Sequence, residues 1–342
     1  MKLRQITLAL AIAAMASTAH ASSVVRINPD GVAGGDPVIH VAALDWSPGN
    51  SLAAPVAPLT RAADVGLGSV LQTYAHARLS AFKDADNRNI TTPGLDVSYE
   101  WTFVAAFQEI YDNNPNTFLP AFMVIPGGIN FFEIWVSPPN SSDLTGRNFA
   151  ATTHPNTPDA TKVLAGNVLP FNPVTGVGAT TFSPTAFFPL PPNDALDQFG
   201  GVDNYTGVKS IAGVGGGSLA VEVTFVNTNY FLTPPTILLA NFSTELTLPY
   251  KKADPSSCFW NGSGYISGVG PIDGGHPDQC DTNTVGPHNG LPSSLGGTGP
   301  NNVLFQDSSM SFVTRAVPEP ATLALVGLGL VGLGFSLRRR SA

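Results

Sequence analysis

The residues near the C-terminus form the clearest chemical pattern in this sequence, and the pattern suits cleavage by a protease. The triplet Pro318-Glu319-Pro320 precedes an apolar run at 321–337, and Arg338-Arg339-Arg340 follows that run. Proline lacks a backbone N–H and restricts the residue before it, so the triplet predicts an extended and accessible segment. The apolar run has about the length of the shortest membrane-spanning helices. The arginines favour a C-terminus on the cytoplasmic side. Together these features predict a sorting signal with a transmembrane segment; an ordinary single-pass anchor is the alternative.

The first residues predict export. Lys2 and Arg4 give a basic start, an apolar stretch follows, and Ala19-His20-Ala21 has the small-x-small form of a signal-peptide cleavage site. We therefore expect residues 1–21 to be a signal peptide that is cut after Ala21. The mature ectodomain is then 22–316, followed by the sorting signal at 317–342.

The C-terminal arrangement resembles the PEP-CTERM signal of Gram-negative bacteria that make exopolysaccharide. The resemblance implies that a membrane protease of the exosortase family is a partner of this chain. It also implies that residues 321–337 anchor the chain transiently in the inner membrane before processing. The expected destination is the cell surface or the extracellular matrix.

The charge balance argues against nucleic acid as a partner. Five of the 16 basic residues lie in the two terminal signals, which leaves 11, fewer than half the 24 acidic residues of the chain. Binding to a polyanion depends on clustered Lys and Arg. An acidic protein with few charged residues is better suited to contact with neutral polymers.

The two cysteines, Cys258 and Cys280, predict a disulfide, because an even pair in an exported chain usually pairs. The bond closes a loop rich in glycine and aspartate that has little to bury. A metal site with His276 and Asp278 is the competing interpretation, but the cysteine spacing matches no zinc motif. We therefore expect no metal site there.

One other segment has the composition of a cation site. The spaced oxygens of 84–89 resemble half of a calcium loop, but Arg88 occupies a ligand position and no glycine follows. A solvated turn is the simpler interpretation, so we expect no cofactor and keep calcium as an alternative. Trp46, Tyr111 and Trp260 lie in polar surroundings and are either platforms for sugar rings or parts of hydrophobic caps.

The sequence contains no nucleophile elbow, zinc-protease motif or P-loop, and it singles out no pair of carboxylates for glycoside hydrolysis. We therefore expect a protein that is not an enzyme.

Alternating apolar and polar residues predict the elements that carry these features. Period-two patterns occur at 71–79, 96–103, 219–226, 238–248 and 303–313, and 122–125 and 131–136 flank a Pro-Gly-Gly turn that predicts a hairpin. No comparable helical period is present in the mature chain. The expected fold is all-β, an antiparallel β-sandwich or jelly roll. The irregular stretch 137–206 is either a long loop or a linker between two β-lobes.

Several mature segments also resemble the flocculation-associated PEP-CTERM protein family. They are Asp96-Val97-Ser98-Tyr99-Glu100-Trp101-Thr102-Phe103, Gly127-Gly128-Ile129-Asn130-Phe131-Phe132-Glu133-Ile134, 219–235, and Val303-Leu304-Phe305-Gln306-Asp307 leading into Ser311-Phe312. Ser308-Ser309-Met310 departs from the usual Ala-Asn-rich step of that family. The resemblance implies cell aggregation within an exopolysaccharide matrix, in a floc or biofilm. The alternatives are a secreted polysaccharide-active hydrolase and a calcium-dependent surface structural protein.

Overall fold

The computed structural model describes residues 23–56, 68–113, 120–143, 146–150, 160–173, 180–184, 214–245, 256, 258–267 and 302–314. Strands and turns make up these residues, and no helix is present among them. The all-β class predicted from the alternating pattern is confirmed.

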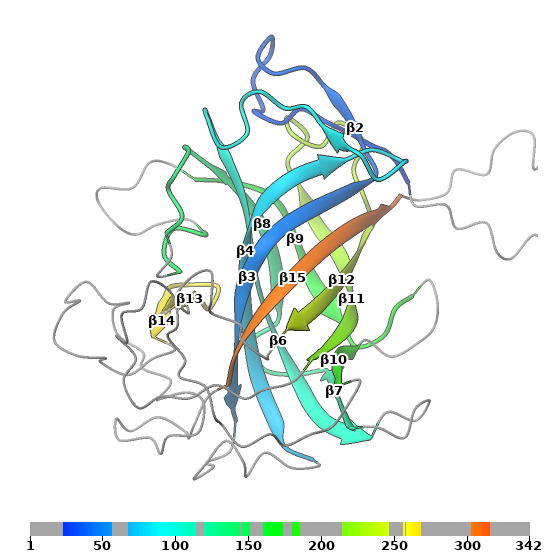
Figure 1. The fold of residues 1–342 in the computed structure, drawn as a ribbon, viewed down its shortest axis with the longest axis vertical. Helices are drawn as coiled ribbons and strands as arrows, with labels where there is room; N and C mark the ends of the chain where they lie inside the picture. The colour runs from blue at the N-terminus through cyan, green and yellow to red at the C-terminus, as the bar shows by residue number, and fades with distance from the viewer. Residues whose placement is uncertain are drawn as a thin grey trace, which may run out of the picture.

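Ten strands form the body of the described protein (Figure 1). They are β3 (Ala43–Pro55), β4 (Val70–Lys83), β6 (Glu100–Asn113), β7 (Pro120–Ile125), β8 (Phe131–Ser137), β9 (Thr161–Leu169), β10 (Thr180–Pro184), β11 (Val214–Val226), β12 (Ile237–Glu245) and β15 (Asn302–Val313). The short strands are β1 (Val25–Ile27), β2 (Ile39–Val41), β5 (Asn89–Ile90), β13 (Cys258–Trp260) and β14 (Tyr265–Ser267).

The sheet closes on itself. Within the described residues, β3, β4, β6, β8, β9, β11, β12 and β15 pair in this order, each antiparallel to the next, and β15 returns to pair with β3. The strands of the ring thus follow one another in chain order, as in an up-and-down barrel, although the shorter strands β5, β7, β10, β13 and β14 intervene along the chain. The predicted sandwich or jelly roll is not what forms. Alternation requires only that each strand packs one face into the core, and a sandwich and a barrel both satisfy this requirement. Only the long-range pairing of β15 with β3 distinguishes the two architectures.

The predicted hairpin around Pro126 is also wrong. β8 pairs with the first half of β6, and β7 pairs with the second half. β7 and β8 therefore lie one after the other along the same side of β6 and do not pair with each other as a hairpin. The residues between them form an outward loop. Gln72 holds this loop, because its side-chain amide donates to the carbonyl of Ile129 (2.9 Å) and its Oε1 accepts from the Ile129 N–H (3.0 Å). β9 and β10 share β11 in the same manner, so both lie in the barrel, within the stretch 137–206 that was expected to be a long loop or a linker.

Two predicted strands differ from the structure at one end. β6 begins at Glu100, since Asp96 has a φ of +60° in a turn, and Val97 is 71% exposed rather than packed. In β11 the register shifts between Val223 and Phe225, which leaves the Phe225 ring 46% exposed.

The barrel interior is filled by the inward residues of its strands. On β6 these include Trp101 and Phe103, and Phe132 of β8 stacks on Phe103 with ring centroids 5.6 Å apart. β1, β2 and the turn at 227–235 close one end of the barrel. There the buried Phe231 contacts Trp101, whose indole N–H donates to the carbonyl of Pro29 (2.8 Å).

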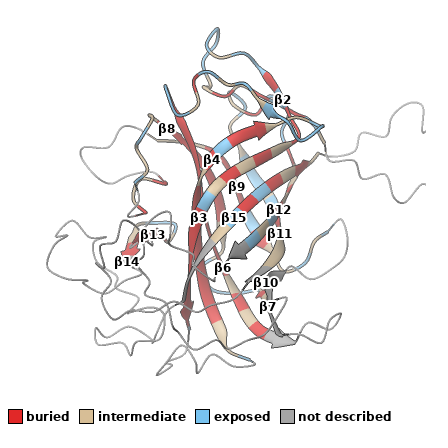
Figure 2. Ribbon diagram, viewed as in Figure 1, coloured by how far each residue is buried: buried red, intermediate tan, exposed pale blue. Residues whose placement is uncertain are grey.

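The outer surface of the barrel is covered on one side only. The β13–β14 hairpin and residues 146–150 pack over β4, β6 and β8, where Val104, Trp135, Phe149, Ala150 and Trp260 form a second apolar cluster. The outer face of β12, β15 and β3 has no comparable cover among the described residues, and Figure 2 shows its exposed positions in pale blue.

Candidate functional site

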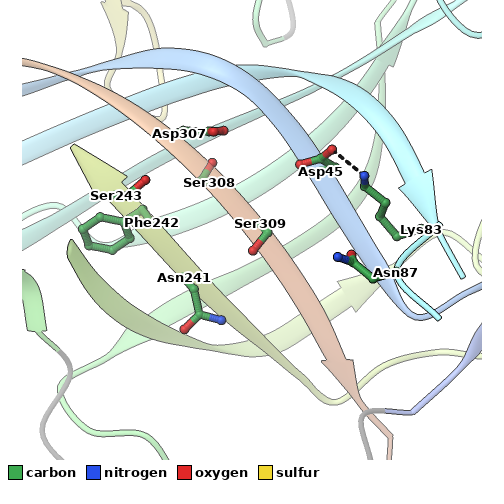
Figure 3. Close-up of a pocket in the computed structure, with 9 residues that line it drawn as sticks. All are labelled: Asp45, Lys83, Asn87, Asn241, Phe242, Ser243, Asp307, Ser308 and Ser309. Carbon is green, nitrogen blue, oxygen red and sulfur yellow. Dashed lines mark ion pairs between the residues drawn. The ribbon is translucent and has the colours of Figure 1, made fainter. Parts of the chain in front are cut away.

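A shallow hollow of about 420 Å³ lies on this uncovered face, across β12, β15, β3 and the end of β4. Its lining is mostly polar (Figure 3). The lining residues are Asp45, Lys83, Asn87, Asn241, Phe242, Ser243, Asp307, Ser308 and Ser309. We call this hollow the polar groove.

Strand alternation explains why these side chains reach solvent. On β15, Asp307 and Ser309 are exposed and alternate with residues that face the core, such as Met310. Register then sets Asn241 of β12, Ser309 of β15 and Asp45 of β3 opposite one another across three strands. Residues opposite one another on neighbouring strands have Cβ atoms about 5 Å apart. The groove therefore presents an amide, a hydroxyl and a carboxylate in one row.

Charge in the groove is partly neutralised. The Lys83 ammonium lies 3.0 Å from the Asp45 carboxylate, as the dashed line in Figure 3 marks. Both side chains are partly exposed, so this ion pair contributes little to stability and serves mainly to fix the position of the carboxylate. Asp307 adds a second carboxylate on the neighbouring strand. The lining thus offers hydrogen-bond donors and acceptors with a small excess of negative charge.

None of the three aromatic residues considered as sugar platforms is available. Trp46 is 1%, Tyr111 7% and Trp260 8% exposed. Trp46 lies in the core, edge-on to Phe103, and Trp260 packs against Tyr265 within the β13–β14 hairpin. The platform hypothesis is wrong for these residues, and the alternative interpretation as hydrophobic packing is confirmed.

The segment 84–89 forms a tight turn. The Asp84 carboxylate accepts hydrogen bonds from the backbone N–H groups of Asp86 (2.9 Å) and Arg88 (2.8 Å). Asn87 has a φ of +61°, and Asp86 pairs with Arg88 at 3.2 Å. Among the described residues, no three His, Cys, Asp or Glu side chains gather as a metal site would require.

A buried histidine lies on the covered side of the barrel. The His76 ring stacks on Phe149 (centroids 4.2 Å apart) and lies 4.9 Å from the ring of Phe259. Its Nε2 is 2.9 Å from the Ser256 hydroxyl, and its Nδ1 has no hydrogen-bond partner among the residues described. Burial lowers the pKa of His76 to about 3. His76 is closed off from solvent, so it holds the hairpin rather than meeting a substrate.

Residues 316–340 match the family model of the PEP-CTERM protein-sorting motif. The chain carries a PEP-CTERM sorting motif. The match includes the Pro318-Glu319-Pro320 triplet and all three arginines, Arg338 to Arg340. The motif implies an exported protein that an exosortase processes. No curated protein and no solved structure matches the chain.

The residues predicted for export and sorting lie outside the described part of the PEP-CTERM chain. These are Ala19 and Ala21, Pro318 to Pro320, the run 321–337 and Arg338 to Arg340. Among the described residues no helix is long and apolar enough to cross a bilayer. Cys258 is buried at the start of β13, but Cys280 lies outside the described residues, so the disulfide stays a prediction.

Sequence reasoning missed the polar groove. Asn241 and Ser309 belong to predicted strands, and their polar character marks them as outward positions. Nothing in the sequence aligns them with Asp45, because that alignment depends on register between strands more than 60 residues apart in the chain.

Proposed function

We propose that this chain is a non-enzymatic surface protein that promotes cell aggregation by binding exopolysaccharide, and that the polar groove is its contact with the polymer. The observation that carries the proposal is the row of Asn241, Ser309 and Asp45 on an uncovered sheet face. Amide, hydroxyl and carboxylate groups are the side chains that pair with sugar hydroxyls. A shallow groove along strands suits a chain polymer better than a small molecule, which proteins usually enclose.

The charges that line the groove favour binding to a polymer with little negative charge. The groove contains one lysine, and that lysine is already paired with Asp45. Binding then depends on hydrogen bonds, and ring stacking on Trp46, Tyr111 or Trp260 is excluded by their burial. Interactions of this kind are screened only weakly by salt. The resemblance to the flocculation-associated family gives the biological setting, a floc or biofilm matrix.

The test uses the purified mature protein and the exopolysaccharide of its own producer. Wild-type protein is expected to co-sediment with the polymer and to leave the polymer's chain length unchanged. It is also expected to bind the polymer almost equally at 0.05 and 0.5 M salt. The double variant Asn241→Ala with Ser309→Ala removes two hydrogen bonds, so a loss of roughly tenfold in affinity is expected. The matched control is Asn167→Ala with Thr224→Ala, which alters exposed residues on β9 and β11 outside the groove.

Each contrary result points to a specific alternative. Equal binding by the groove variant and the control excludes the groove as the binding site for the polymer. Shortened polymer favours the hydrolase, in which Asp45 and Asp307 are the carboxylates to substitute first. Loss of binding with a chelator favours the calcium-dependent structural protein. A deletion strain that flocculates normally contradicts the adhesive role itself.

A further inference from the structure

The two ends of the described chain are joined at one end of the barrel. The Thr314 N–H donates to the Ser23 hydroxyl (3.1 Å), the Thr314 hydroxyl also contacts Ser23 Oγ (2.8 Å), and the Ser23 N–H donates to the carbonyl of Phe312 (2.9 Å). Ser23 follows the predicted signal-peptide site by two residues, and Thr314 precedes the matched sorting motif by two. The described residues nearest the two processed segments, Ser23 and Thr314, therefore lie together at the barrel end that carries β2 (Figure 1).

The chain between this point and the apolar run is short. Residues 315–320 separate Thr314 from Ala321. The seven Cα–Cα steps from Thr314 to Ala321, even fully extended, span at most about 25 Å. When the run 321–337 enters a bilayer, the barrel end that carries β1 and β2 is consequently held within about that distance of the lipid surface.

That same end displays apolar side chains. Five of the nine large hydrophobic residues that are exposed in the described structure belong to segments that close it. They are Val24, Val32, Val38, Val97 and Leu232, with exposed fractions of 42, 59, 42, 71 and 39%. Figure 2 shows exposed positions on the loops around β2.

Hydrogen bonds fix these segments in place. The Asp30 carboxylate accepts from the N–H groups of Val32 (3.0 Å) and Asp36 (2.8 Å). Asp36 in turn accepts from the Tyr99 hydroxyl (2.7 Å) and the Gly94 N–H (3.0 Å), on the segment that carries Val97. The valines are thus presented by a rigid frame, and leaving them in water costs free energy in proportion to their exposed apolar area.

We infer that, before exosortase cleavage, the barrel stands with its β1–β2 end against the bilayer, and that Val32, Val38 and Val97 enter the lipid interface. The inference rests on the proposal that 321–337 spans the membrane. The charged groups at this end carry both signs: Arg26 is exposed, while Asp96 faces Arg78 at 3.8 Å. The surface is not basic, so the contact does not require anionic lipid.

The test uses the full uncut chain, reconstituted in phosphatidylcholine vesicles. A polarity-sensitive fluorophore is attached through Val97→Cys, and the control position is Val56→Cys. Val56 is also exposed (47%), but it follows β3 at the opposite end of the barrel. Wild-type protein is expected to take up no label, because its two cysteines are predicted to pair.

The label at position 97 is expected to shift to shorter emission wavelength and to be quenched at least twofold more than the label at 56 by lipids with nitroxide headgroups. Adding Val32→Asp and Val38→Asp is expected to reduce that quenching. Equal quenching at 97 and 56, while the chain still floats with the vesicles, overturns the inference and leaves the membrane span intact. Failure to float contradicts the span, and the inference with it. An emission shift at position 97 that disappears when more of the same lipid is added at constant protein indicates contact between two copies instead, and also overturns the inference. The polysaccharide-binding assay is independent of all these outcomes.

Discussion

His76 Nε2 lies 2.9 Å from Ser256 Oγ, and this contact ties β4 of the barrel to the start of the β13–β14 hairpin, 180 residues later in the chain. The two rings that flank the imidazole, Phe149 and Phe259, come from the two segments that cover this side. The covered side of the barrel is therefore organised around one neutral histidine.

Acid is expected to weaken the protein through His76. Burial lowers the pKa of His76 from 6.5 to about 3, so the unfolded chain binds a proton between these values and the folded chain does not. Stability then falls as pH decreases from about 6.5 toward 3, with a limiting slope of about 1.4 kcal/mol per pH unit. Urea unfolding between pH 4 and 7 measures the slope. His76→Gln should flatten it, whereas His40→Gln, at an exposed position on β2, should leave it unchanged. An unchanged slope in His76→Gln contradicts the assignment.

Gly146→Ala is expected to release the hairpin. Gly146 has a φ of +92°, and a Cβ there would lie 2.1 Å from the carbonyl oxygen of Cys258 and 2.9 Å from His76 Cε1. Gly34 has a similar φ, +82°, but open space around the Cβ position. Gly34→Ala should therefore cost only the backbone strain, about 1 kcal/mol, and Gly146→Ala should cost at least about 2 kcal/mol more. Thermal unfolding compares the two, with Trp260 fluorescence as the local readout. Equal losses would show that the contact with Cys258 is not restrictive.

The predicted bond between Cys258 and Cys280 should appear as a linked pair in peptide mapping without reductant. Closing a loop of this length contributes on the order of 3 kcal/mol. Reduction is expected to loosen the hairpin more than the barrel, because the ring from β3 to β12 lies outside the closed loop. Hydrogen exchange measured with and without reductant distinguishes the two regions. Two free thiols in freshly exported protein would refute the pairing.

Processing is expected at both ends of the chain. Mass spectrometry of surface material should find a protein that begins near Ser22 and lacks the residues from Ala321 onward. A chain with Pro318→Ala and Pro320→Ala is expected to keep its tail, because the accessible extended segment is lost. Recovery of the arginine tail from wild-type surface protein would leave an ordinary membrane anchor as the explanation.

The sequence predicts individual strands better than their arrangement. The alternation at 303–313 matches β15 closely, since Met310 and Phe312 are fixed by burial in the core. It fails at 96–99, where the residues alternate although the backbone turns, because Asp96 adopts a left-handed conformation that pattern alone does not reveal. The two strands flanking Pro126 are predicted correctly, but their shared partner β6 is not, because partner choice depends on contacts distant in sequence.

For the polar groove, too, the sequence predicts individual residues better than their arrangement. The outward orientation of Ser309 can be read from the residues, whereas its position beside Asn241 and Asp45 arises from barrel closure. His76 gave no signal, because a buried imidazole held by two rings looks in sequence like any isolated histidine.

Barrel closure also bears on when this protein folds during secretion. The first and last strands of the ring, β3 and β15, are separated by about 250 residues, and β15 ends three residues before the matched motif. A chain that crosses the membrane with its N-terminus first delivers β15 only when translocation is nearly complete. Until then β3 and β12 remain open edges that can pair with other chains. We therefore expect folding to the closed form to be delayed until the sorting signal itself is exported, so that the exosortase meets a barrel that has only just become complete.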